Sequence, residues 1–261
     1  MSTALIGATG FVGTSLLRQR SFDHLFHSRN IDELPERYYD LVVCAGAPAQ
    51  KWIANRDPAA DRERLASLRN AIRRVECARF VLVSTVDVFS RAIEVDESSA
   101  PDASNANAYG LHRLELEEHV RSRFPSALIV RLPGLVGPGL RKNIIYDFHH
   151  ANNMDAIDSR ARFQFYPVVQ LWSDLSTALA SGLGLVHLTA EPVSVAEVAQ
   201  VVLGLPFANQ RPGVPAEYDF RSEYAALFGG GGKYQYSRRE SLIAIRAYRQ
   251  SEPQISAESS S

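Results

Sequence analysis

The stretch TALIGATGFVG, residues 3–13, decides the fold of this chain. TALI predicts a short buried strand, and the residues from Thr14 to Arg20 continue as a helix after a glycine-rich turn. Glycines in such a turn let the chain reverse tightly, let the backbone approach a pyrophosphate and let the helix pack close to the sheet. The helix N-terminus then presents N–H donors and a positive dipole end to an anion. The stretch therefore predicts a nucleotide-phosphate site whose glycines are Gly7, Gly10 and Gly13.

The sequence after this turn alternates short apolar runs with longer amphipathic ones, the pattern of βαβ units on a parallel sheet. We predict an α/β fold: a Rossmann-type, doubly wound, mostly parallel sheet with a small C-terminal substrate lobe. The expected later strands are Phe22 to Ser28, Leu41 to Gly46, Phe80 to Val86, Ala127 to Leu132 and Leu185 to Leu188. The expected later helices are Asp61 to Arg74, Tyr109 to Arg123, Ile144 to His150, Leu171 to Ala180 and Val193 to Gly204, the last with a Ser194–Glu197 capping box.

The regular alternation weakens after residue 133, which sets the expected domain boundary. We predict a dinucleotide-binding core over residues 1–135, to which residues 166–190 return. Residues 136–165 and 191–250 form the expected substrate lobe. The polar residues 251–261 are expected to be a disordered tail.

Composition argues against several classes of function. Lys plus Arg number 28 and Asp plus Glu 29, so the chain lacks the basic surplus with which nucleic-acid-binding proteins neutralise phosphates. No apolar run approaches the ~20 residues needed to cross a bilayer, and no basic segment precedes an apolar one at the N-terminus. We therefore expect a cytoplasmic protein with no nucleic-acid partner and no membrane partner.

The residue types that bind metals or form disulfides show no such pattern here. Cys44 and Cys77 lie in or beside apolar segments and outside any CxxC knuckle, which predicts buried, reduced thiols. His149 and His150 are adjacent, so one helix face does not present both of them to a metal ion. We expect no metal site.

The spacing GxxGxxG resembles that of the short-chain dehydrogenase/reductase superfamily, and GATGFVG resembles its extended and atypical branches. Extended members usually carry Thr before the first glycine, where this chain has Ile6, as atypical members do. VLVSTVDVF (81–89) is similar to the strand end that carries the catalytic hydroxyl, YGLHR (109–113) to the YxxxK box, and LIVRLPGLVGPG (128–139) to the segment that closes over the nicotinamide. The resemblance implies a chain that binds NADP or NAD. It assigns cofactor contacts to Gly7, Thr9, Gly10, Phe11, Val12, Gly13, Ser28, Arg29, Ala45, Gly46 and Pro133.

The cofactor preference rests on the residues that follow the second expected strand. A site for NAD presents an acidic residue to the ribose hydroxyls at this point. Ser28 and Arg29 instead offer a hydroxyl and a guanidinium, which suit a 2′-phosphate. We therefore predict a preference for NADP, and Asp32 nearby keeps NAD as the alternative.

Thr85 and Tyr109 are the expected catalytic hydroxyls. A Tyr hydroxyl moves a proton on or off the substrate oxygen during hydride transfer if a nearby cation lowers its pKa, which is about 10 in water. The Thr hydroxyl binds the same oxygen. Position 113 lies one helical turn beyond Tyr109 and shares its face. Family members have Lys there, which also holds the nicotinamide ribose, whereas this chain has Arg113.

The exchange of Lys for Arg leaves two functions open. In the first, Arg113 supplies the cation and the ribose anchor, and the chain is an NAD(P)-dependent oxidoreductase or epimerase. In the second, the exchange has removed turnover, and the chain is a non-catalytic or impaired NAD(P)-binding sensor or scaffold. His112 is expected to be an exposed helix residue, and the segment WIANRDP after Lys51 fits none of these patterns.

The resemblance also implies a substrate class. The segment GLRKNIIYDF (139–148) corresponds to the place where family members bind the diphosphate of a nucleotide-linked sugar. Asn143 and Arg141 are the expected substrate contacts, and Arg162 is a further candidate phosphate contact. The family often dimerises through the helix that bears the Tyr, which implies a homodimer.

The residues after Thr85 narrow the reaction. Sugar-nucleotide 4,6-dehydratases place Asp and then Glu directly after the catalytic Thr, whereas Val86 and Asp87 stand here, which argues against dehydration. Reduction, oxidation and epimerisation at a sugar carbon stay open. A small non-sugar carbonyl compound also stays open as the substrate.

Overall fold

The structure, a computed structural model, describes residues 1–34 and 38–253. Within this part the backbone divides into two compact units. The first comprises Met1–Arg91, Glu97–Leu132 and Leu171–His187, and the second comprises Ala92–Asp96, Pro133–Gln170 and the described residues from Leu188 onward. Of the tail expected at 251–261, Ser251 ends a helix, and residues 254–261 lie outside the described residues.

The first unit is built on a six-stranded parallel sheet. Its strands are β1 (Thr3–Ile6), β2 (His24–Phe26), β3 (Tyr38–Cys44), β4 (Glu76–Thr85), β6 (Leu128–Leu132) and β10 (Leu185–His187). Their order is β10-β6-β4-β3-β1-β2, and every neighbouring pair runs parallel. The chain reverses its direction of travel across the sheet between β1 and β3, the switch point at which doubly wound sheets bind ligands. The predicted α/β fold class is confirmed.

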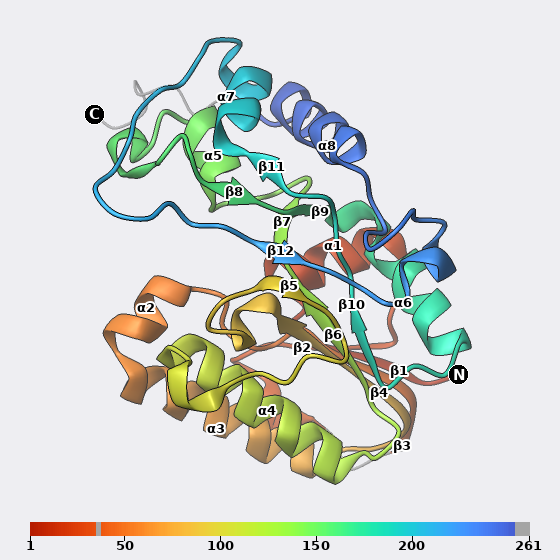
Figure 1. Ribbon diagram of the computed structural model, residues 1–261. Helices are drawn as coiled ribbons and strands as arrows, with labels where there is room; N and C mark the ends of the chain where they lie inside the picture. The colour runs from red at the N-terminus through yellow and green to blue at the C-terminus, as the bar shows by residue number, and fades with distance from the viewer. Residues whose placement is uncertain (35–37, 254–261) are drawn as a thin grey trace. The chain divides into compact units, whose positions relative to one another are not determined.

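Helices cover both faces of this sheet (Figure 1). The helices of the first unit are α1 (Phe11–Gln19), α2 (Lys51–Arg56), α3 (Pro58–Arg73), α4 (Ala108–Arg123) and α6 (Leu171–Ala180), of which α2 packs against α3 and α4. α3 and α4 pack side by side on one face, whereas α1 and α6 contact each other on the opposite face. Asp57 caps α3 by accepting a hydrogen bond from Ala60 N, and Asn107 caps α4 by accepting one from Gly110 N.

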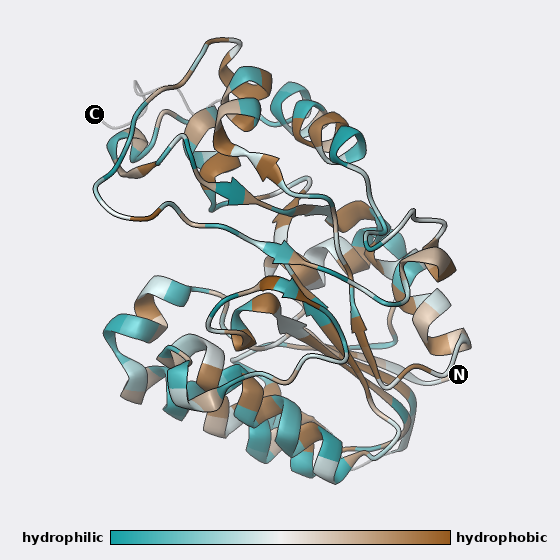
Figure 2. Cartoon of the chain, in the orientation of Figure 1, coloured by the Kyte–Doolittle hydropathy of each residue, from teal (hydrophilic) through white to brown (hydrophobic). Residues whose placement is uncertain are grey.

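Apolar residues of the sheet and helices form the core of the first unit. Phe80 on β4 stacks on Phe124 at the end of α4, with ring centroids 4.5 Å apart. Figure 2 shows α3 and α4 alternating hydrophilic and hydrophobic residues, as helices with one face on a sheet do. Cys44 is buried, Cys77 is half-buried, and both are free thiols. Burial raises the pKa of Cys44 to about 12, which makes its thiol unreactive.

One charged network lies inside this core. Arg131 on β6 is 2% exposed; its Nη2 donates to Glu117 Oε2 over 2.7 Å and its Nε donates to Glu117 Oε1 over 3.0 Å. Ser84 Oγ donates to the same carboxylate over 2.6 Å. A buried strand accommodates an arginine only when its charge is paired and hydrogen-bonded in this way.

The second unit contains three two-stranded sheets and three α-helices among the described residues. The parallel pairs are β7 (Gly134–Val136) with β9 (Phe165–Pro167) and β5 (Ile93–Val95) with β12 (Asp219–Phe220), and the antiparallel pair is β8 (Arg162–Phe163) with β11 (Val193–Ser194). The helices are α5 (Ile144–His149), α7 (Val195–Leu203) and α8 (Arg238–Ser251). Short 3-10 helices in the two units are η1 (Ile31–Glu33), η2 (Val86–Val88), η3 (Ala103–Asn105), η4 (Met154–Ala156), η5 (Val168–Gln170) and η6 (Ala225–Phe228).

Helix α8 was not among the elements expected from the sequence. It begins with a capping box in which Ser237 Oγ accepts from Glu240 N and Glu240 Oε2 accepts from Ser237 N. The same pattern correctly placed the start of α7 at Ser194. Ile245 and Tyr248 are buried three residues apart on α8, so both the cap and the periodicity were present in the sequence. In residues 1–34 and 38–253, no helix is both long and apolar enough to span a membrane.

Several element boundaries differ from the expected ones by a few residues. β4 begins at Glu76 rather than Phe80, because its polar first residues pair with β3. Val86 belongs to η2 and not to the strand. α3 begins at Pro58 rather than Asp61, because proline is favoured in the first turn of a helix.

Candidate active site

The glycine turn joins β1 to α1 and is fixed by backbone hydrogen bonds. Gly7 has a φ of +87°, a conformation that favours glycine. The N–H groups of Gly7 and Ala8 donate to Phe26 O, at the end of β2, over 2.8 and 3.0 Å. Gly10 N donates to Gly7 O over 3.0 Å. The turn is therefore tied to the end of the neighbouring strand.

The three glycines of the turn are required for different reasons. A Cβ at Gly7 would overlap the backbone of Ala45 and Gly46, which follow β3 at the switch point. A Cβ at Gly13 would overlap the carbonyl group of Gly7. A Cβ at Gly10 would meet Gly7 O at 3.4 Å, and Gly10 is exposed. Two glycines thus permit close backbone packing, and the third keeps the outer surface of the turn clear.

The first turn of α1 is suited to an anion. It contains no acidic residue, and Gly10 supplies no side-chain cap. N–H groups in the first turn of a helix lack intrahelical acceptors. Thr9 is exposed, and Phe11 and Val12 are half-buried. Backbone donors therefore dominate this surface, as binding of a pyrophosphate requires.

Ser28 and Arg29 lie in the loop after β2, and both side chains are exposed. His27 N donates to Asn30 Oδ1 over 2.7 Å, and Arg29 N donates to His27 Nδ1 over 3.2 Å, which makes the loop compact. β2 runs parallel to β1, so this loop and the glycine turn lie at the same edge of the sheet.

Thr85 ends β4 and Tyr109 lies in the first turn of α4, and the two hydroxyls are hydrogen-bonded to each other. Thr85 Oγ1 also accepts from Asp87 N over 3.2 Å. Tyr109 N donates to Asn55 Oδ1, on α2, over 3.0 Å. α4 approaches η2 closely because Gly110 has no side chain: a Cβ there would overlap Asp87 O. The structure therefore brings the two expected catalytic hydroxyls together.

Arg113 lies one helical turn beyond Tyr109, and its guanidinium is buried. Nη1 donates to Asp61 Oδ2 and Nη2 donates to Asp61 Oδ1 over 2.9 Å, which makes a bidentate pair. Nη2 also donates to Pro48 O, and Nη1 donates to Tyr109 O over 3.3 Å. Nε is buried without a partner among the described residues. The guanidinium carbon lies 3.9 Å from the centre of the Tyr109 ring, so the two groups stack.

The expectation that His112 is exposed is wrong. His112 is 4% exposed, and its Nδ1 lies 2.8 Å from Asp61 Oδ2. The reason is the packing of α3 on α4, which places the Asp61 carboxylate against this face of α4. Burial raises the pKa of Asp61, but hydrogen bonds from Arg113 and His112 outweigh it and hold the pKa below its usual value.

Burial also raises the pKa of Tyr109 above its ordinary value, and the charges around the ring act in both directions. Arg113 lowers the pKa, Asp87 raises it, and the hydrogen bond with Thr85 and the charge of Lys51 lower it. Arg113 thus acts in the direction expected for the cation, but it does not offset burial.

The expected substrate contacts belong to the second unit. Asn143 has a φ of +103°, and its Oδ1 accepts from two N–H groups in the first turn of α5 over 2.9 and 3.4 Å. Its Nδ2 donates to Leu135 O over 2.9 Å, so its amide holds the backbone of the loop. Arg141 and Arg162 are exposed, and Pro133 is buried directly after β6.

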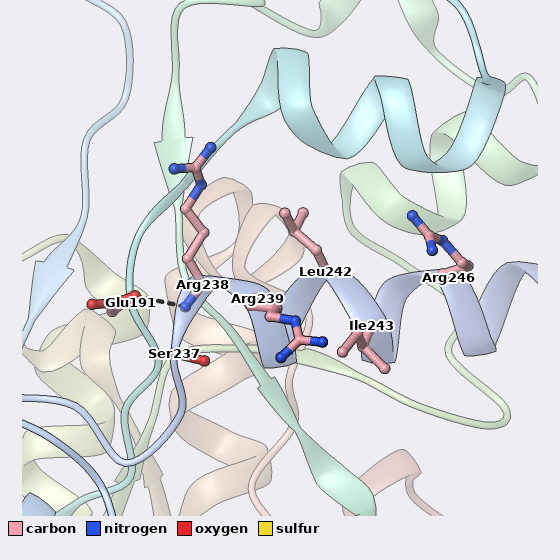
Figure 3. Close-up of a pocket in the computed structure, with 7 residues that line it drawn as sticks. All are labelled: Glu191, Ser237, Arg238, Arg239, Leu242, Ile243 and Arg246. Atoms are coloured by element: carbon pink, nitrogen blue, oxygen red, sulfur yellow. Dashed lines mark hydrogen bonds between the residues drawn. The ribbon is translucent and has the colours of Figure 1, made fainter.

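A hollow of about 600 Å³ lies along α8 in the second unit (Figure 3). Arg238 N donates to Glu191 Oε2 over 2.7 Å at one end of it. None of the sequence-predicted site residues lines it; the lining residues are Glu191, Ser237, Arg238, Arg239, Leu242, Ile243 and Arg246. Among the described residues, no three His, Cys, Asp or Glu side chains are grouped to hold a metal ion.

No family model matches this sequence, and no curated protein matches it. Solved structures do. The UDP-galactose 4-epimerase structure has 17% identity and a TM-score of 0.72, and the match covers 96% of this chain and 98% of that one. The enzyme WbmG from Bordetella bronchiseptica, in complex with NAD, has 16% identity, a TM-score of 0.74 and coverages of 96% and 94%. RMD from Pseudomonas aeruginosa, complexed with NADPH, has 18% identity, a TM-score of 0.70 and coverages of 96% and 100%.

The chain has the fold of these enzymes. At such identities the likeness establishes the architecture and leaves the site to be argued from this chain's own residues. The six-stranded parallel sheet and the glycine turn at its switch point are the parts that bear on a nucleotide cofactor.

We call the cluster around the Thr85–Tyr109 pair the Tyr109 corner; its other members are Arg113, Asp61, Asn55, Lys51 and Asp87. Sequence patterns missed three of these residues, Asp61, Asn55 and Lys51. One signal was present: Asp61 lies four residues before Leu65 and seven before Leu68, on the apolar face of its helix. A carboxylate on such a face indicates a buried partner. No sequence pattern indicated that the segment around Lys51 and Asn55 belongs to the site. Its helix, α2, is only six residues long, which is too short to show a helical periodicity.

Proposed function

We propose that this chain is an NAD(P)-dependent oxidoreductase or epimerase that acts on a nucleotide-linked sugar. The supporting observation is that the glycine turn and the Thr85–Tyr109 pair both follow strands of one parallel sheet, so they lie at the same edge. Ligands of doubly wound sheets bind at this edge. The similar UDP-galactose 4-epimerase supports the substrate class, and the similar structures with NAD and NADPH support the cofactor.

The turn fits a dinucleotide. Gly10 leaves the outer surface clear for the pyrophosphate, and the first turn of α1 supplies N–H donors. Ala45 and Gly46 flank the same site from the end of β3. Ser28 and Arg29 face the 2′-phosphate, so NADP is the preferred cofactor and NAD the alternative. When bound, the nicotinamide gives or takes the hydride.

Tyr109 is the proposed acid/base, and Thr85 is its partner. In a reduction the Tyr109 O–H gives its proton to the substrate oxygen, and in an oxidation the phenolate takes it back. The Thr85 hydroxyl donates to the same oxygen and holds it beside the Tyr hydroxyl. The Arg113 guanidinium stacks on the Tyr109 ring. Its Nε has no partner among the described residues and is the donor left for a ribose hydroxyl.

The second unit is the proposed substrate lobe. Exposed Arg141 and Arg162 supply guanidinium groups for the diphosphate, and Asn143 shapes the loop that carries Arg141. A homodimer formed through α4 and a cytoplasmic location stay predictions.

A second function is favoured by the pairing of Arg113 with Asp61, which neutralises the cation expected to activate Tyr109. A chain of this kind that binds the cofactor without turnover is a sensor or scaffold. The variant Arg113→Lys separates the two functions. Loss of a measured activity supports an enzyme adapted to Arg, whereas continued inactivity with candidate sugars supports the sensor.

The first test is a fluorescence titration of the purified protein with NADPH and with NADH. We expect micromolar dissociation constants, with NADPH bound more tightly. The variant Tyr109→Phe is the matched control, because it retains the turn and should bind both dinucleotides while abolishing turnover of nucleotide sugars. Absence of binding to either dinucleotide contradicts the proposed function in both its forms.

A further inference from the structure

Helix α2 and the segment before it are held against the start of α4 by polar contacts to the Tyr109 backbone and to the Arg113 side chain. Asn55 Oδ1 accepts from Tyr109 N over 3.0 Å, and Pro48 O, just before α2, accepts from Arg113 Nη2. All of these residues belong to the first unit. The segment that no sequence pattern explained is therefore part of the wall of the Tyr109 corner.

Lys51, the first residue of α2, carries a positive charge into this corner. Its Nζ donates to Asp87 Oδ1 over 2.7 Å. Asp87 N in turn donates to Thr85 Oγ1, and Asp87 O lies directly against Gly110. Lys51, Asp87, Thr85 and Tyr109 thus form one continuous polar arrangement.

The two cations of the corner differ in how they are held. The Arg113 side chain is 3% exposed, and its four terminal N–H groups go to Asp61, Pro48 O and Tyr109 O. The Lys51 side chain is 39% exposed, and its ammonium ends a flexible stem. Arg113 is therefore held in a buried bidentate pair with Asp61, whereas Lys51 pairs with Asp87 through the single ammonium of a partly exposed side chain that lies nearer to solvent.

We propose that Lys51 is a positioning residue that supplies the responsive positive charge at the Tyr109–Thr85 pair, a task for which Arg113 is already committed to Asp61. The inference rests on the proposed function and deepens it. When Tyr109 passes its proton to the substrate oxygen, the phenolate that remains is stabilised by the Lys51 ammonium. Asp87 opposes this effect and is partly neutralised by the same lysine.

The charged groups that face Tyr109 come from three elements. They are Arg113 from α4, Asp87 from η2 and Lys51 from α2, and Asp61 from α3 acts through Arg113. Burial disfavours the phenolate most; Arg113 favours it, Asp87 disfavours it, and Lys51 favours it less strongly than Arg113 does in the resting structure. Loss of the Lys51 charge is therefore expected to raise the pKa of Tyr109 for two reasons. It removes a cation, and it leaves the negative charge of Asp87 uncompensated.

The test follows the ionisation of Tyr109 directly, with no cofactor or substrate. Tyrosines are replaced biosynthetically by a fluorinated tyrosine, whose phenol is more acidic, and titrated by fluorine NMR; the signal lost in Tyr109→Phe assigns the residue. We expect Lys51→Gln to shift the midpoint upward, Asp87→Asn to shift it downward, and the double variant to return it toward wild type. Lys51→Arg should stay near wild type.

Arg56→Gln is the matched control, because it removes an exposed cation from the same helix, where Arg56 stacks on Trp52. Its midpoint should equal that of wild type. Equal midpoints for Lys51→Gln and Arg56→Gln overturn the inference. A lower melting temperature for Lys51→Gln that Lys51→Arg does not repair overturns it too, because it indicates a purely structural residue.

The outcome is distinguishable from failure of the proposed function. The titration reports on Lys51 even if neither dinucleotide binds. If a nucleotide sugar is turned over, Lys51→Gln should displace the pH profile of kcat to higher pH and leave KM within about twofold. A uniform fall in kcat with an unmoved profile contradicts the inference while leaving the enzyme assignment intact.

Discussion

The glycine turn and the Tyr109 corner lie at the same edge of one sheet, yet they are built in opposite ways. The turn is made of backbone from one short stretch of chain, Gly7 to Gly13, with hydrogen bonds to the end of one neighbouring strand. The corner is made of charged side chains from α2, α3, α4 and η2. Its central pair, Asp61 and Arg113, is 52 residues apart in the chain.

This difference determines what each region tolerates. In the turn, what matters is the absence of side-chain atoms at Gly7 and Gly13, so the effects of substitution are steric. In the corner, what matters is the balance of buried charge, so removing one partner leaves the other unpaired in a medium that solvates it poorly. The largest loss of folding stability is therefore expected in the corner.

Asp61→Asn should give the largest effect. It removes the counter-ion of a buried guanidinium with little change of shape, and breaking such a pair costs about 3–5 kcal/mol of unfolding free energy. Urea unfolding measures it. Glu115→Gln on α4 is the matched control, because Glu115 pairs with half-exposed Arg62 and its loss should cost less than about 1 kcal/mol. Equal costs for the two variants would show that the corner's charges are as well solvated as surface ones.

The pH dependence of this difference sharpens the comparison. The pKa of Asp61 is lower in the folded protein than in the unfolded chain, so its carboxylate adds stability above its unfolded pKa. That contribution is lost as pH falls through the folded pKa. The gap in unfolding free energy between wild type and Asp61→Asn should therefore be constant near neutrality and shrink in acid. A gap that widens in acid contradicts the assignment.

In the turn, Gly13→Ala and Gly10→Ala should separate packing from ligand space. The Cβ of the first would overlap Gly7, and overpacking of this kind costs roughly 1–3 kcal/mol. The Cβ of the second meets only Gly7 O at 3.4 Å, so unfolding should change by less than about 1 kcal/mol. Gly10→Ala should nevertheless weaken binding of both dinucleotides about tenfold, because its methyl group enters the space proposed for the pyrophosphate. If Gly10→Ala binds NADPH as tightly as wild type does, the turn is not part of the cofactor site.

The same contrast explains what the sequence revealed. The sheet, its helices and the glycine turn follow from local patterns, because apolar runs and a glycine triplet act over a few residues. The proximity of Thr85 and Tyr109 followed from a family resemblance, and the structure brings their hydroxyls together. The partners of Arg113 did not follow, since nothing near position 113 indicates that α3 delivers Asp61 to it. His112 was misplaced for the same reason.

Helix α8 is a different kind of omission. Its Ser237–Glu240 capping box and its buried Ile245 and Tyr248 are local signals of the sort that placed α7 correctly. The reason for missing it is that four glycines, Gly229 to Gly232, precede it shortly before its cap, a composition typical of loops. Local rules therefore suffice to place α8, whereas the charges of the corner require the tertiary structure.

Arg29→Ala should give the smallest effect on the protein and the most selective one on its ligand. Arg29 is exposed, so stability should change by less than about 0.5 kcal/mol. Affinity for NADPH should fall about tenfold, equivalent to about 1.4 kcal/mol, because the guanidinium is the proposed partner of the 2′-phosphate. Affinity for NADH should not change, since NADH lacks that phosphate. Equal losses for the two dinucleotides would place Arg29 on a group that they share, and Asp32 would then become the residue that decides for NAD.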